Sequence, residues 1–264
     1  MTNFVCMNEY ISPRGAYGSR GAYVADVSAR KLAFLRRVYA YFTGSLLAAV
    51  AGALVALYAG ADLSRLVVTV GQQRVVVPPL VAFFTNHMWL GIGLFFGSFF
   101  VASWARERPG VNVLALLGLG FVSGLYIAPM LWIATVMASQ GATLSAAPVR
   151  DAFVLAGLGF TGLTSYALLS RRDFSFMRGF LTMGLWVVIG ASLLSLFVGG
   201  PSLSLAIASV SVLLFGGFIL YDTSRMAQDP DNRDAAGAAL QLYLNFLNLF
   251  LALLRILGSS RRES

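Results

Sequence analysis

Charged side chains are scarce in this chain of 264 residues. They make up 11% of it, against about 25% in an average soluble domain, while hydrophobic residues account for 58%. This composition excludes an ordinary soluble protein and predicts an integral membrane protein. The uncharged runs are long and continuous, whereas a transmembrane barrel would show alternating segments of about 10 residues. We therefore expect an all-α protein with spans of roughly 20 apolar residues each.

Three reactive residue types occur only once each, as Cys6, Lys31 and His87. A single cysteine excludes an intrachain disulfide and a thiolate metal cluster. No uncharged run contains a lysine, which excludes a retinal Schiff base inside a helix. A lone histidine cannot supply a multi-ligand metal site. We therefore expect no metal centre and no tightly bound cofactor.

Sequence motifs of common enzyme classes are also missing. The chain contains no G-x-S-x-G, no H-E-x-x-H and no phosphate-binding loop. The pair Tyr221-Asp222 resembles one half of the intramembrane aspartyl protease signature, but the second half, G-x-G-D, does not occur. We expect a protein that is not an enzyme.

Charged residues divide the chain into uncharged runs that cover residues 38–61, 75–105, 109–149, 152–170, 179–221 and 235–254. Two of these runs are too long for one span. Ser139-Gln140-Gly141 interrupts the third run, and Gly199-Gly200-Pro201-Ser202 splits the fifth into two helices. The pattern predicts a bundle of seven transmembrane helices, centred near residues 48, 91, 124, 161, 188, 213 and 246.

The same boundaries divide the chain into three parts. Residues 1–37 form a basic cytoplasmic N-terminal tail, residues 38–258 a seven-helix transmembrane domain and residues 259–264 a short C-terminal tail. The stretch Gly15–Arg30 is rich in Gly, Ala, Ser and Arg, so we expect part of the tail to be disordered.

The distribution of basic residues predicts the orientation. With the tail inside, thirteen basic residues lie on the inner side and only Arg65, Arg74 and Arg150 lie in outer loops, as the positive-inside rule requires. Orientation thus explains the net charge of +8 without nucleic acid. Seven full crossings place Arg255 and the arginines after it outside, against the rule. A last segment that re-enters without crossing is therefore the alternative.

Small residues recur four positions apart, a spacing that lets helix backbones approach closely in lipid. They are Gly44, Ala48, Gly52 and Ala56 in the first span, Gly93 and Gly97 in the second, and Gly120 and Gly124 in the third.

The last span carries one polar stripe on an otherwise apolar helix. At 100° per residue, Gln241, Asn245, Asn248 and Arg255 fall within about 80° of one another. Amides that face lipid would lack partners, at a cost of several kcal/mol each. The stripe should therefore face protein or water, either as hydrogen-bonding contacts between helices or as the lining of a cavity.

Two titratable groups lie within or at the end of a span. Asp222 ends the sixth span, and Arg225 three positions on allows a local ion pair at the membrane surface. Turned inward instead, Asp222 would be a proton or cation site. His87 lies about eight residues into the second predicted span. It could titrate near neutral pH, but we expect a packed, hydrogen-bonded side chain.

Five segments resemble the Bax inhibitor-1 family of membrane proteins, and the resemblance covers nearly all of the chain after residue 30. The segments are Leu35–Tyr39, Gly124–Pro129, Ser170–Phe176, Gly217–Ser224 and Leu242–Phe250. The resemblance implies seven helices, with the last one running through the middle of the other six. It also implies a bacterial inner membrane protein, because bacterial members show such motifs.

Bacterial members of the family include a pH-dependent calcium leak protein and a modulator of a membrane-anchored AAA protease. In the leak proteins two aspartates, one on each of the last two helices, are thought to share a proton. Asp222 matches the first aspartate, but Asn245 occupies the position of the second. Those members also pair an aspartate with a basic residue of the second helix, and residues 75–105 contain no Arg or Lys.

The resemblance therefore implies a pH-influenced calcium leak or cation-sensing protein with its site at Asp222 and Asn245. Gln241, Asn248, Arg225 and His87 are the supporting polar groups, and the implied partners are the lipid bilayer and transiently bound calcium. An Asp–Asn pair lacks like-charge coupling, so we expect weaker pH gating than in a two-aspartate member. The alternative is a non-transporting regulator that binds the AAA protease through its basic tail.

Overall fold

Helices make up nearly all of the computed structural model, which describes residues 13–60, 66–70, 73–141, 143–170, 172–228 and 234–259. The elements follow one another as α1 (Pro13–Tyr58), β1 (Val67–Val70), β2 (Gln73–Val76), α2 (Pro79–Asn86), α3 (Met88–Ala105), α4 (Val111–Ser139), α5 (Pro148–Ser170), α6 (Met177–Val198), α7 (Pro201–Gln228) and α8 (Ala235–Leu257). Within the described residues, seven helices are long and apolar enough to cross a membrane: Ser28–Tyr58 of α1, and α3 to α8.

The helix boundaries follow the turn signals of the sequence. Gly141 (φ +68°) lies between α4 and α5, and Gly199 (φ +66°) with Gly200 (φ +108°) lies between α6 and α7. These positive φ angles favour glycine because a Cβ atom is strained there. The prediction of seven spanning helices is therefore confirmed.

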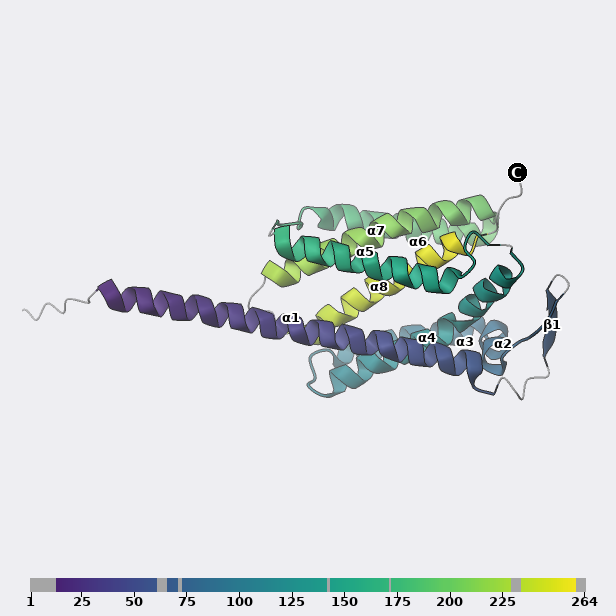
Figure 1. Cartoon of the computed structure of the whole chain (residues 1–264), viewed down its shortest axis with the longest axis horizontal. Helices are drawn as coiled ribbons and strands as arrows, with labels where there is room; N and C mark the ends of the chain where they lie inside the picture. Colours follow the sequence, from purple (N-terminus) through teal and green to yellow (C-terminus); the bar gives the residue numbers. More distant parts are fainter. Residues whose placement is uncertain are drawn as a thin grey trace, which may run out of the picture.

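The last helix, α8, lies in the middle of the bundle. In Figure 1, α5, α6 and α7 lie on one side of α8, and α1 to α4 lie on the other. More than half of the apolar stretch of α8 is buried, a larger share than in any other described span. The predicted central position of the last helix is confirmed.

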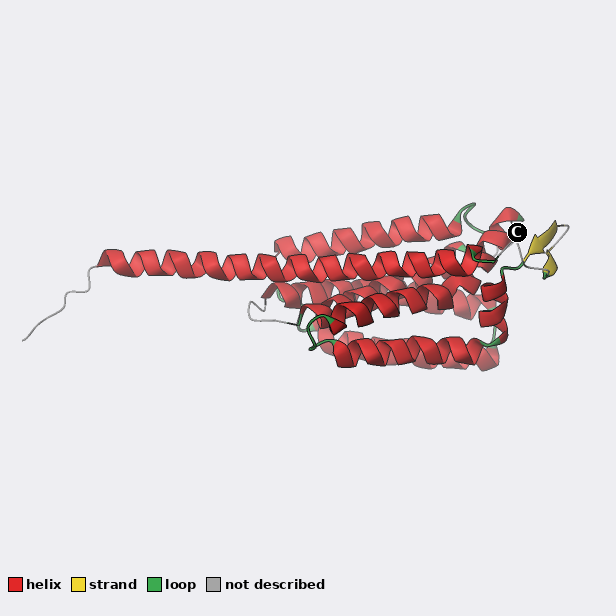
Figure 2. Cartoon of the chain, turned by 90° about the horizontal axis from the view of Figure 1, so that it is seen from below, coloured by secondary structure: helices red, strands yellow, loops and turns green. Residues whose placement is uncertain are grey.

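The two ends of the bundle differ in shape. At the tail end α1 extends far beyond the other helices, and at the hairpin end β1 and β2 project (Figure 2). The N-terminal cap of α8, Asp234, lies beside Arg106 of the α3–α4 connection at the tail end. At the other end, Leu144 N and Ser145 N of the α4–α5 loop donate to the carbonyls of Ser259 and Leu257. α8 therefore crosses the whole bundle and does not re-enter.

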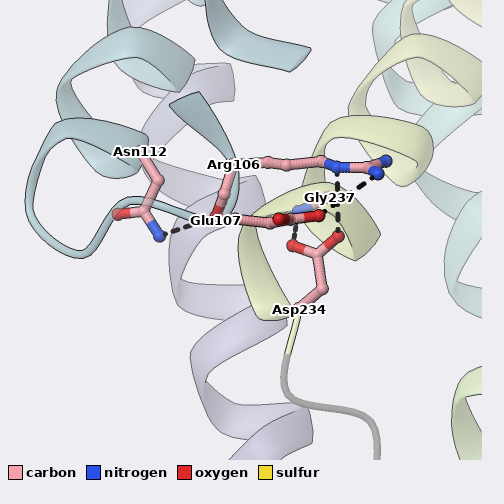
Figure 3. Close-up of polar contacts among 5 residues, drawn as sticks. All are labelled: Arg106, Glu107, Asn112, Asp234 and Gly237. Atoms are coloured by element: carbon pink, nitrogen blue, oxygen red, sulfur yellow. Dashed lines mark hydrogen bonds and ion pairs between the residues drawn. The ribbon is translucent and has the colours of Figure 1, made fainter. Parts of the chain in front are cut away.

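A small polar cluster holds the start of α8 against the α3–α4 connection (Figure 3). Asp234 Oδ1 accepts a hydrogen bond of 2.7 Å from Gly237 N, and Asp234 Oδ2 lies 3.8 Å from Arg106 Nε. The Asn112 amide donates to the Arg106 carbonyl at 3.2 Å. A Cβ atom at Gly237 would collide with the Asp234 carboxylate, so this cap requires a glycine there.

Helices α1 and α4 form the closest backbone contact of the bundle. A Cβ atom on Gly52 would collide with the carbonyl of Phe121, and one on Gly124 with the carbonyl of Ala49. The predicted small-residue contact is thus confirmed for the first and third spans. It is wrong for Gly97, and likewise for Gly93, because a Cβ atom there would have nothing within 4 Å. Spacing alone does not say which face of a helix meets a neighbour.

The uncharged run 75–105, which contains the predicted second span, is not one helix. Its start belongs to the hairpin, in which Val67 pairs with Val76, and a break at His87 (φ −119°, ψ 52°) separates α2 from α3. β-branched valines favour strands, and a short apolar run does not distinguish strand from helix. The spanning part is therefore α3 alone.

The stretch Gly15–Arg30, part of which we expect to be disordered, belongs to α1 in the structure. α1 begins at Pro13 and continues without a break into its membrane-spanning part, so the boundary expected near residue 37 is absent. Extending an existing helix costs far less than nucleating one, and proline is compatible with the first helical turn. Residues 1–12 and 260–264 lie outside the described residues.

The contact between α1 and α4 yields a test. Gly124→Ala should lower the melting temperature of the purified protein, because overpacking typically costs about 1–3 kcal/mol. Gly97→Ala is the matched control and should leave the melting temperature unchanged or slightly higher, since alanine favours helix more than glycine does. An equal fall in the melting temperature of both variants would contradict the assignment of this contact between α1 and α4.

Candidate functional site at Asp222 and Asn245

A hydrogen bond between the last two helices joins the two residues that the sequence places at the site. Asp222 of α7 and Asn245 of α8 are each only 8% exposed. Asn245 Nδ2 donates to Asp222 Oδ2 at 2.7 Å. A buried carboxylate needs such a donor, because an unsatisfied buried charge is costly. The structure thus provides the carboxylate with a neutral amide partner.

Arg225 does not share this contact. Its side chain is exposed and lines a separate hollow of about 420 Å³ at the tail end, together with Asp173, Arg178 and Gln228. Within the described part of the chain, no ion pair within 4.0 Å joins Asp222 to a cationic side chain. Of the two orientations considered for Asp222, the inward one is therefore observed.

The polar stripe of α8 faces a groove of about 830 Å³ between α6, α7 and α8. The groove is lined by Asp222 and by all members of the stripe: Gln241, Asn245, Asn248 and Arg255. Of the four stripe residues, only Asn245 forms a side-chain hydrogen bond to another helix within the described part of the chain. Asn248 Nδ2 donates to the Leu244 carbonyl of its own helix at 2.7 Å. The stripe therefore lines a cavity more than it joins helices.

The bundle is closed along one side of α8 and open along the other. On the closed side Phe42 of α1 stacks on Phe160 of α5 at 4.7 Å, and both rings contact Phe246 of α8. On the open side α6 packs on α7 and α3 packs on α4, with no extended packing between α3 and α6 in the described residues. Both of these helices lie at the back of Figure 1. The lining of the groove comes from α6, α7 and α8, and none of the three packed rings belongs to it.

His87 lies away from this groove. It stands at the break between α2 and α3, where its exposed ring packs edge-on against Phe83 with centroids 4.9 Å apart. The structure therefore does not bring His87 to the site, and it is not the packed histidine expected from the sequence. The expectation depended on one unbroken helix over residues 75–105.

The sequence reasoning missed two sets of buried hydroxyl groups. Ser123 of α4 is hydrogen-bonded to Tyr243 of α8. Near Asp222, the Tyr39 hydroxyl of α1 faces Thr164 of α5 and Thr223 of α7, although none of the three forms a regular hydrogen bond with any described residue. Hydroxyl groups within apolar runs were the available signal, but their partners lie on other helices.

The donor set of the groove suits a weakly held, hydrated cation. Among the described residues, no cluster of three or more His, Cys, Asp or Glu side chains could hold a metal ion. Calcium prefers six to eight oxygen ligands. The groove offers one carboxylate, Asp222, and the amide oxygens of Gln241, Asn245 and Asn248. Water would have to complete the coordination.

Comparison with known proteins agrees with this architecture. The family model described as "Inhibitor of apoptosis-promoting Bax1" matches residues 31–262. The chain belongs to the Bax inhibitor-1 family.

Several relatives extend over most of the chain. A Helicobacter pylori protein without an assigned role is 32% identical over 243 residues, which cover 91% of this chain and 94% of that protein. The "Golgi anti-apoptotic protein" of vaccinia virus is 29% identical over 244 residues, 92% of either chain. An "uncharacterized membrane protein" of Vibrio cholerae is 49% identical over 110 residues, 42% of this chain and 49% of its own length. The Bax inhibitor-1 assignment thus extends over the whole membrane bundle.

The bond between Asp222 and Asn245 yields a second test. Asn245→Leu removes the amide donor from a buried carboxylate, and it should destabilise the protein by about 1–3 kcal/mol. Asn248→Leu makes the same chemical change on the same helix but removes only a bond to its own backbone. In thermal unfolding in detergent, the melting temperature should fall clearly further for Asn245→Leu than for Asn248→Leu. A loss of equal size in both variants would argue against a special role of this bond.

Proposed function

We propose that this Bax inhibitor-1 protein passes or senses cations, calcium among them, through the groove beside α8. The observation that carries the proposal is the buried Asp222 carboxylate, held by Asn245 at the floor of that groove. Ionisable residues inside membrane helices are costly and commonly mark ion or proton pathways. In this role Asp222 attracts the cation, and Asn245 positions the carboxylate. The role is not catalytic.

The partner of Asp222 determines how the proposed site responds to pH. Two adjacent carboxylates titrate as a coupled pair, because both cannot be charged cheaply at the same time. Asn245 has no charge to lose or gain. We therefore propose a shallower pH response than in family members with two aspartates at these positions.

Calcium flux into liposomes tests this proposal. The wild type should pass calcium with a shallow dependence between about pH 6 and 8, and Asp222→Asn should reduce the flux several-fold. Asn245→Asp should make the dependence steeper, because it restores the coupled pair. Asp173→Asn, which neutralises an exposed carboxylate outside the groove, is the control and should behave like the wild type.

Two results would contradict the proposal. Equal flux in the wild type and in Asp222→Asn would exclude Asp222 as the cation site. A steep wild-type transition that disappears in Asp222→Asn would exclude the weak pH response.

We also propose that the protein lies in a bacterial inner membrane with the tail end in the cytoplasm. Exposed arginines gather at the tail end, from the first span and from two connections between helices, as expected for cytoplasmic segments. They include Arg36, Arg37, Arg106, Arg108 and Arg172.

A second candidate function is regulation of a membrane-anchored AAA protease. The observation that favours it is the extension of α1, because residues 13–27 form a helix that precedes the spanning part and projects beyond the bundle (Figure 2). This segment carries Arg14 and Arg20. A projecting basic helix could be the contact that the protease recognises.

Deletion of residues 1–27 distinguishes this role from cation passage. If the extension binds the protease, co-purification with the protease should be lost, while helix content and calcium flux remain. The double variant Arg14→Gln/Arg20→Gln keeps the full length of the extension but removes two of its positive charges. It therefore separates the effect of charge from that of length. Unchanged co-purification of the deletion variant would exclude the extension as the contact.

A further inference from the structure

Arg255 is a cation at the hairpin end of the groove that the cation proposal leaves without a role. It lies in the last turn of α8, and its side chain is exposed. At 1.5 Å per residue, it is roughly 15 Å along the helix from Asn245. No carboxylate of the described residues lies within 4.0 Å of its guanidinium group. An arginine at the end of a spanning helix extends toward the lipid headgroups, where phosphate groups can supply its counter-charge.

A second, smaller hollow meets the groove at Arg255. It has a volume of about 260 Å³ and lies between α4, α7 and α8, with Pro201 and Ser204 of the first turn of α7 on its wall. The N-terminal end of a helix carries a partial positive charge. The guanidinium group and the start of α7 therefore both favour an anion in this hollow.

The groove beyond Arg255 is apolar on most of its surface. Its apolar lining includes Val188 and Leu193 of α6, Ile207 and Phe215 of α7, and Leu251 of α8. The residues that line it belong to the spanning helices α6, α7 and α8. A water-soluble anion would gain nothing from these walls, whereas a hydrocarbon chain would fit them.

We propose that Arg255 and the groove bind one anionic phospholipid of the surrounding membrane. Its phosphate lies against Arg255 and the first turn of α7, because a guanidinium group can bind phosphate oxygens with two parallel hydrogen bonds. One acyl chain runs from there along the apolar walls of the groove, past Leu251 of α8. The volume of about 830 Å³ is within the range of about 300–1,000 Å³ that ligand pockets usually have.

This site is independent of the proposed cation site, because Asp222 and Arg255 lie at opposite ends of the groove. Asp222→Asn should therefore leave lipid binding unchanged. Failure of the calcium assay would not affect the lipid proposal.

The headgroup part is tested by titrating the purified full-length protein in detergent with phosphatidylglycerol and counting bound lipids by native mass spectrometry. Arg255→Gln should weaken binding roughly tenfold, the scale of a charged hydrogen bond. The control is Arg150→Gln, which changes an exposed arginine near the same end that already pairs with Asp151 at 2.9 Å. It should bind like the wild type. Arg255→Lys, which keeps the charge but loses the planar fork, should give an intermediate affinity.

The acyl-chain part needs a separate variant. Ser192→Phe narrows the groove from α6 and should weaken binding although Arg255 is intact, whereas Ser209→Phe changes an exposed serine of α7 that does not line the groove and should have no effect. Glycerol phosphate, which has the same anion without acyl chains, should not compete. Lipid binding is compared only among variants whose elution volume and helix content match those of the wild type, so that misfolding is excluded as a cause.

Three results would overturn the proposal. Wild-type affinity of Arg255→Gln would exclude the arginine as the phosphate ligand. Equal losses in Arg255→Gln and Arg150→Gln would show unspecific attraction by surface charge. Wild-type affinity of Ser192→Phe, or effective competition by glycerol phosphate, would show that no acyl chain occupies the groove.

Discussion

The cost of leaving amide groups in hydrocarbon constrains the whole bundle. α8 carries three side-chain amides along one face, and a helix with such a face is unstable when lipid surrounds it. Five of the other spanning helices, α1, α3, α4, α5 and α7, pack against α8, and more than half of its apolar stretch is buried. The polar stripe of α8 faces the groove, where polar ligands, water or lipid headgroups can reach it.

The groove exists because the two halves of the bundle meet α8 unequally. Aromatic rings from α1, α5 and α8 close one side, with Phe42 stacked on Phe160. On the other side, α3 packs on α4 and α6 packs on α7, without extended packing between α3 and α6 in the described residues. Carbonyl-to-glycine contacts hold α1 against α4, and flexible side chains cannot replace such contacts. Close packing in one half thus leaves the opposite side available for ligands.

Within this groove one carboxylate and one guanidinium group stand far apart. Asp222 receives a neutral donor from Asn245, and Arg255 lies at the other end, beside the start of α7. The two ligands that we propose, a cation and a lipid phosphate, would therefore bind at opposite ends of one groove. Membership in the Bax inhibitor-1 family accounts for the shared architecture.

Local composition by itself determined the seven helices, their boundaries at Gly141 and Gly199, and the polar stripe of α8, because hydropathy and helical period depend only on neighbours along the chain. Tertiary structure alone decided which side chains meet. Gly124 lies against α1, whereas a Cβ atom on Gly97 would meet no described residue of another helix within 4 Å. Asp222 binds Asn245 and not Arg225, and His87 lies at a helix break. Each of these outcomes depends on which face of a helix is turned toward another helix. That choice is made by the packing of the whole bundle, where many contacts far apart in sequence are satisfied together.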